Sequence, residues 1–188
     1  MDVKTLKKIR SFTIKEYAKS QDRQHNFAHA ERVAKNALWI TDVLKIKEGV
    51  DKNLLQAACY LHDIVLVRRN NGNYFSWLYN HIFEKHLNKR YLKEILECFG
   101  LPQEENKILT AAIVNHSYSI PYRLLNKQGD LYSKILQDAD SLDYVSVKRA
   151  DIFIKKKGKI LTHLINLYLS WIKNDLGRYL NFPQLTNE

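Results

Sequence analysis

The sequence predicts an all-α protein that forms a single compact helical bundle. Apolar residues recur at a spacing of about 3.6 along most of the chain, which is the period of an amphipathic helix. The six glycines fall between the periodic segments, as expected of residues that separate helices, and none is expected inside a helix. The sequence has no glycine-rich phosphate loop and no strands alternating with helices, which disfavours a nucleotide-binding fold built on a parallel sheet.

Three helices are expected in the first third of the chain. The first covers about residues 3–18 with Asp2 as its N-cap, and the second covers roughly residues 27–46. Asp51 caps the third helix. Its buried stripe consists of Leu54, Leu55, Ala58 and Leu61.

The later helices are less sharply bounded. Residues 75–99 form one long helix or two, because residues 88–90 interrupt the apolar pattern without a clear breaker. Pro102 opens the next helix, which runs to His116. Segments at about 131–155 and 159–176 complete the set. The apolar stretch of 13 residues at 160–172 is too short to span a membrane, so a core helix is expected there.

Length and charge limit the possible functions. A chain of 188 residues without repeats or a low-complexity linker is expected to form one domain, residues 1–188. The N-terminus lacks the apolar segment of a secretory signal, so we expect a cytoplasmic protein that does not act at a membrane. A net charge of +10 favours anionic partners such as phosphorylated small molecules or nucleic acid. The densest basic stretch, residues 148–159, is equally explained as a solvated helix end.

Two groups of residues near the first helices have the chemistry of metal ligands. His25 and His29 are four residues apart at the entry to the second helix, so one helix face could present both. His62 and Asp63 end the apolar run LLQAACYLHDI, where a helix end would let both neighbours reach one ion. A structural histidine beside a surface aspartate explains the second pair equally well.

The segment ILQDADSLDYV places three aspartates around a buried helix face. Asp140 and Asp143 share a face, while Asp138 points elsewhere. Burying carboxylates is costly unless they are paired or bind a metal. A solvated acidic edge is the alternative. His116 ends another helix in mostly apolar surroundings, where a structural role competes with a catalytic one.

The order of these fragments resembles the HD superfamily of metal-dependent phosphohydrolases. HNFAHAERV, LHDI, NHSYS and QDADSLD follow one another as in small stand-alone bacterial HD hydrolases, whose signature reads approximately HDxxHxxRV, LHD, HS and QDADxLD. The resemblance covers about residues 20–150. It implies an HD-domain bundle with a motif-bearing core at about 20–155 and the metal site between helices. The C-terminal helix and tail, residues 156–188, have no assigned role.

The resemblance implies that His29, His62, Asp63 and Asp140 hold a divalent metal ion. Two imidazoles and two carboxylates suit Mn, Co, Fe or Zn, with Mg as a further possibility. Such an ion lowers the pKa of bound water from ~15.7 to about 7 and polarises a phosphoryl oxygen, so no protein nucleophile is needed. Asp63 is then catalytic as well as a ligand.

Several positions depart from the family pattern. Asn26 replaces the acid that usually follows the first histidine, and Ser141 stands where a basic residue commonly follows DAD. Leu66 replaces a carboxylate found in some nucleotidase relatives. The Glu–Asp pair of guanosine-tetraphosphate hydrolases is missing after LHDI. The last two departures disfavour the nucleotidase subclass and the guanosine-tetraphosphate hydrolase subclass.

The remaining roles fall to His116 and to four basic residues. His116 is the best candidate for the general acid. Phosphate could be held by basic side chains after the metal doublet or in the later basic stretch. These are Arg68, Arg69, Lys148 and Arg149.

The preferred function is hydrolysis of a phosphate ester or anhydride of a small molecule, with a nucleotide as the favoured substrate. A nuclease acting on single-stranded nucleic acid is an alternative that only the net charge supports. A catalytically silent HD module that binds a nucleotide or a protein is another, which the changes at Asn26 and Ser141 permit. The sequence does not predict an oligomeric state.

Overall fold

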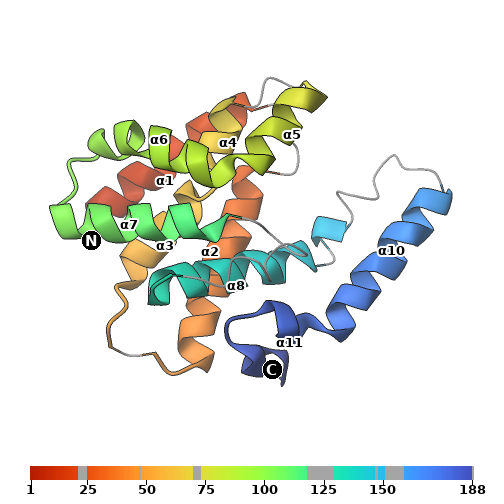
Figure 1. The fold of residues 1–188 in the computed structure, drawn as a ribbon. Coiled ribbons are helices and arrows are strands. Elements are labelled where there is room, and N and C mark those ends of the chain that lie inside the picture. Colours follow the sequence, from red (N-terminus) through yellow and green to blue (C-terminus); the bar gives the residue numbers. More distant parts are fainter. Residues whose placement is uncertain are drawn as a thin grey trace.

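The computed structural model describes residues 1–20, 25–46, 48–69, 73–117, 129–146, 148–150 and 159–187 (Figure 1). These parts of the chain contain helices and no strand, which confirms the all-α prediction. The helices are α1 (Val3–Lys19), α2 (Phe27–Val43), α3 (Lys52–Leu61), α4 (Ile64–Arg69), α5 (Tyr74–Ile82), α6 (Glu84–Glu97), α7 (Gln103–His116), α8 (Leu131–Tyr144), α10 (Lys159–Asn174) and α11 (Leu176–Tyr179), followed by the 3-10 turn η2 (Pro183–Asn187).

Short polar side chains begin the helices that lead to the site. Asp2 and Asp51 cap α1 and α3, as predicted, and Asp130 caps α8. Asn26 caps α2 by accepting a hydrogen bond from the backbone N–H of His29 at 2.9 Å. The residue that departs from the family pattern therefore fixes the first turn of the helix that carries His29.

Some predicted boundaries are wrong. Helix α2 ends at Val43, because Lys45 has a φ of 53° that a continuing helix does not allow. Residues 75–99 form two helices that meet at Phe83, whereas residues 88–90 lie inside α6. Asn88 fits there because its buried amide donates to the Ile113 carbonyl of α7. Helix α8 ends at Tyr144 rather than near 155, and Gly177 lies inside α11.

The main core forms where α2 packs against α3 and α8; α1 packs against α3 and α2, and α7 packs against α8 and α3. Its largest fully buried side chains are aliphatic, so the helices meet through apolar faces. They are Ile9, Ile40, Leu55, Leu61, Ile64, Leu92, Leu96, Leu109, Ile113, Ile135 and Leu136. Asn36 of α2 also donates to the Ala139 carbonyl of α8 at 3.0 Å, which ties these two helices together beside the site.

The C-terminal residues have two different environments. The tail that follows α11 belongs to the main core, because Leu180 and Leu185 are buried there. Helix α10, expected to be a core helix, instead stands apart from the main group of helices (Figure 1). Only one side of it is buried, in a small cluster with Val145 and Tyr179. No helix in the described residues is long and apolar enough to cross a membrane.

Asp138 attaches the tail to α8. Its carboxylate is fully buried and accepts hydrogen bonds from the backbone N–H groups of Asn181 and Phe182, at 2.8 and 2.9 Å. The side-chain amide of Asn181 donates to the same carboxylate at 2.9 Å. Asp138 thus points away from the candidate metal ligands, as the sequence predicts, and has a structural role.

Replacing Asp138 with alanine should destabilise the protein without touching the metal site. The substitution leaves two backbone N–H groups without an acceptor, which costs about 1–3 kcal/mol for each buried group left unsatisfied. Urea denaturation should show a lower free energy of unfolding for Asp138→Ala. The matched control is Glu97→Ala, which removes an exposed carboxylate and should change stability little. Equal stability of the two variants would contradict this role for Asp138.

Candidate metal centre

His29 lies in the first turn of α2 with its ring held in one orientation. Its Nδ1 is 2.7 Å from Oδ2 of Asp143 on α8. Asp143 is itself fixed by the Arg32 guanidinium, whose Nε and Nη2 donate to its two oxygens at 2.5 and 3.1 Å. Because the carboxylate can only accept, Nδ1 of His29 carries the proton and Nε2 faces the site.

His62 and Asp63 lie at the junction where α3 ends and α4 begins. At this junction two neighbouring residues can face the same point, as expected for a helix end. Nδ1 of His62 is 2.7 Å from the Cys59 carbonyl oxygen, which also cannot donate. His62 therefore presents Nε2 to the site in the same way as His29.

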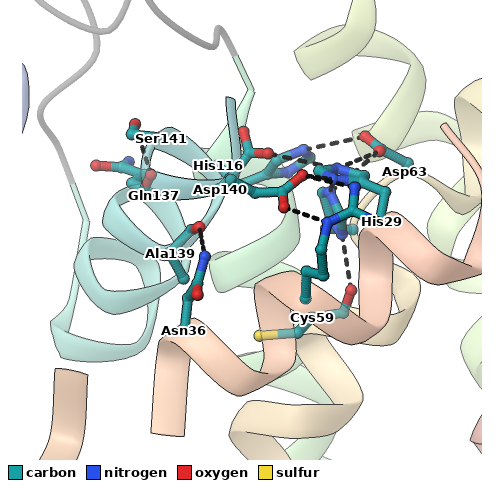
Figure 2. Close-up of polar contacts among 12 residues, drawn as sticks. His29, Asn36, Cys59, Asp63, His116, Gln137, Ala139, Asp140 and Ser141 are labelled. Atoms are coloured by element: carbon teal, nitrogen blue, oxygen red, sulfur yellow. Dashed lines mark hydrogen bonds and ion pairs between the residues drawn. The ribbon is translucent and has the colours of Figure 1, made fainter. Parts of the chain in front are cut away.

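The two Nε2 atoms face each other at 3.1 Å. Each has a lone pair in the neutral imidazole whose Nδ1 is protonated. Two carboxylates approach the same place: Asp140 Oδ1 is 3.4 Å from His29 Nε2 (Figure 2), and Asp63 Oδ2 is 3.0 Å from His62 Nε2. All four residues are buried, with exposed fractions of 6 % or less. Two imidazoles and two carboxylates thus lie side by side with little access to water.

This arrangement fits a divalent metal ion. His29, His62 and Asp140 each offer a ligand atom within 4.8 Å of the others, and His62, Asp63 and His116 form a second, overlapping group. Asp63 Oδ2 accepts no hydrogen bond from the described residues although it is buried. A buried carboxylate oxygen and two facing lone pairs are costly unless a cation lies between them. The mixed nitrogen and oxygen donors suit the transition ions named above.

Glu84 of α6 and His116 of α7 form the far wall of this cluster. Nε2 of His116 is 3.0 Å from Glu84 Oε1 and 3.7 Å from Asp63 Oδ1, and its Nδ1 donates to the Ile113 carbonyl. Burial lowers the pKa of His116, but the two carboxylates outweigh burial and raise this pKa to about 10.

The aspartates show the opposite balance. Burial raises the pKa of Asp63, but His62, His25 and the other histidines around it bring this pKa well below its usual range. In Asp143, burial likewise raises the pKa, and His29 and Arg32 lower it to about 2. Both side chains are therefore carboxylates at neutral pH.

A cavity of about 30 Å³ opens onto the cluster, which is room for about one water molecule or one metal ion. Its walls come from α2, α4, α5, α6, α7 and α8 together with the short helical segment at residues 148–150. The lining residues are His25, His29, Asp63, Leu66, His81, Glu84, His116, Asp140, Tyr144 and Arg149.

One of the four expected phosphate-binding residues lies at this cavity. Arg149 is only 4 % exposed and contributes to the wall. Arg68 instead pairs with Glu16 at 2.5 Å, and Arg69 lies over the Tyr91 ring at 4.7 Å from its centroid. Lys148 is exposed. The described part of the cavity wall includes neither these two arginines nor Lys148.

Sequence reasoning missed three residues of the site. Arg32 is three residues after His29, so helical spacing could have indicated it. The sequence places Asp143 on the same face as Asp140 but does not predict its contact with His29. Glu84 and His81 have no such signal, because they belong to a region whose helix boundary was wrong. His25 precedes the N-cap of α2 and is not on its face, yet its ring centroid lies 6.2 Å from that of His29 and 5.1 Å from that of His81.

Comparison with known proteins agrees with this geometry. The family model of the HD domain matches residues 26–145, which include all four predicted ligands and His116. A crystal structure of a protein from Lactobacillus plantarum has the same fold, with a TM-score of 0.54 and 20% sequence identity. The match covers 84% of this chain and 67% of that chain. No curated protein matches. Because the family model covers more than half of the sequence, this chain belongs to the HD domain family.

Proposed function

We propose that this protein is a metal-dependent phosphohydrolase that cleaves a phosphate ester or anhydride of a small molecule, with a nucleotide as the first substrate class to test. The observation that carries the proposal is the pair of Nε2 atoms that face each other at 3.1 Å beside two buried carboxylates. A divalent ion held by His29, His62, Asp63 and Asp140 would supply an activated water and polarise the phosphoryl group.

Other residues of the cavity have roles that follow from charge and position. Arg149 would hold the phosphate, because a guanidinium matches two phosphate oxygens at once. His116 would protonate the leaving group, since Glu84 and Asp63 favour its charged form. Asp143 would keep the His29 ring in position through Nδ1. Of the basic stretch at residues 148–159, residues 151–158 lie outside the described residues.

Purified protein should contain close to one divalent ion per chain. His62→Ala and Asp140→Ala each remove a predicted ligand and should abolish metal retention after dialysis, measured by elemental analysis. The matched control is His163→Ala, because His163 is exposed on α10 and far from the site in sequence. Stoichiometric metal retained by both ligand variants would overturn the assignment.

Asp143→Asn should weaken metal binding about 10- to 100-fold, which is the usual effect of removing a hydrogen-bonded partner of a ligating histidine. Isothermal titration with Mn²⁺ measures this change in Kd. Asp42→Asn is the control, because Asp42 is an exposed carboxylate at the other end of α2. If the two variants bind Mn²⁺ equally well, Asp143 does not orient His29.

Turnover of nucleoside mono-, di- and triphosphates with Mn²⁺ tests the reaction itself. Asp63→Ala should abolish hydrolysis, because it removes both a ligand and the charge beside the reacting group. Arg149→Ala should lower kcat/KM ten- to hundredfold, since a charge-assisted hydrogen bond contributes roughly 1.5–3 kcal/mol. Arg68→Ala is the matched control, because Arg68 pairs with Glu16 outside the cavity.

Two results would contradict the proposal. Metal-loaded wild type that hydrolyses none of the nucleotides would favour a module that binds a nucleotide or a protein. Equal losses of kcat/KM in Arg149→Ala and Arg68→Ala would exclude Arg149 as the specific phosphate ligand.

A further inference from the structure

Helix α5 has its polar side toward the protein and its apolar side toward solvent. Asn80 is buried and His81 lines the metal cavity. The opposite side presents a stripe with the i, i+3, i+4, i+7 spacing that normally faces a core. The stripe consists of Phe75, Leu78, Tyr79 and Ile82, which are between 38% and 77% exposed, and Phe83 extends it.

The inner side of α5 carries Asn80 and His81, and His81 borders a site made of histidines and carboxylates. Trp77 is half-buried, and the other large apolar side chains described on this helix lie on its outer side. A contiguous exposed patch of large apolar side chains marks an interaction surface.

Helix α10 carries two apolar stripes. The described residues bury one of them and leave the other exposed. Tyr168 and Ile172 face the small cluster around Val145, and Leu169 is also buried. A second stripe of Leu164, Leu167 and Trp171 lies on another side and is 54–56% exposed. A helix that is apolar on two sides is normally buried on both. Helix α10 instead stands apart from the other helices (Figure 1).

We propose that the second stripe of α10 packs onto the outer stripe of α5 in a second copy of this chain. From Phe75 to Ile82 and from Leu164 to Trp171 the stripes each span eight residues, or about 12 Å of helix, so their lengths match. A two-fold axis would form this contact twice, because each copy contributes one α5 and one α10. The two exposed stripes described on these helices are then buried without a third molecule.

The area is sufficient for a stable dimer. Eight large apolar side chains, about half exposed on average, provide on the order of 800 Å² per chain, which is what a standard interface takes from each partner. Neither stripe contains a charged residue, so the contact leaves no unpaired charge in its centre.

The mass of the full chain in solution, measured by size-exclusion chromatography with light scattering, tests this proposal. Wild type should have twice the monomer mass of 22.2 kDa at micromolar concentration. Leu167→Glu/Trp171→Glu on α10 and Leu78→Glu/Ile82→Glu on α5 should each be monomeric. The control Asn166→Glu/Ser170→Glu adds the same charge to exposed polar positions of α10 and should remain dimeric.

Mixing the two monomeric variants identifies which surfaces meet. Each variant keeps the stripe that the other lacks, so the mixture should form a heterodimer that neither variant forms alone. Circular dichroism and metal content like those of wild type would show that both variants are folded.

Three outcomes would overturn the proposal. Wild type could be a monomer, with α10 covering α5 of its own chain or binding another protein. One glutamate variant could still dimerise alone, which would indicate α5–α5 or α10–α10 pairing. Dimers could also persist in both variants, which would place the interface elsewhere.

Discussion

The site depends on two hydrogen bonds that lie outside it. Asp143 holds Nδ1 of His29 and the Cys59 carbonyl holds Nδ1 of His62, so both rings must present Nε2 to the same point. Two lone pairs at 3.1 Å repel each other unless a cation lies between them. The packed helices hold the two rings in this arrangement despite the repulsion. A bound ion would replace the repulsion with attraction and would favour the folded state.

Helix α8 links the site to the rest of the molecule. Asp138 and Asp140 are two residues apart, so they point about 200° apart around the helix. Asp138 binds the C-terminal tail, while Asp140 and Asp143 face α2 and the cavity. One short acidic segment therefore fixes the tail on one side and the candidate metal ligands on the other. This explains why three carboxylates can be buried in a single helix of a basic protein.

The sequence predicts the parts of this arrangement that local chemistry determines. Capping residues such as Asp2 and Asp51 indicate helix starts. The order of the motifs indicates candidate ligand residues, which lie close together in the structure. Contacts between distant helices carry no such signal: nothing near Glu84 in the sequence indicates that it meets His116. The exposure of the second stripe of α10 could not be predicted for the same reason. Apolar spacing predicts that a helix face is buried, but not whether another chain buries it.

Crystals grown with MnCl₂ would show in an anomalous difference map whether an ion binds between the two imidazoles. One strong peak is expected within bonding distance of His29, His62, Asp63 and Asp140, with the Nδ1 atoms of both histidines still bound to Asp143 and Cys59. A map with no peak among these four side chains, or with a peak that either histidine reaches through Nδ1, would contradict this metal site.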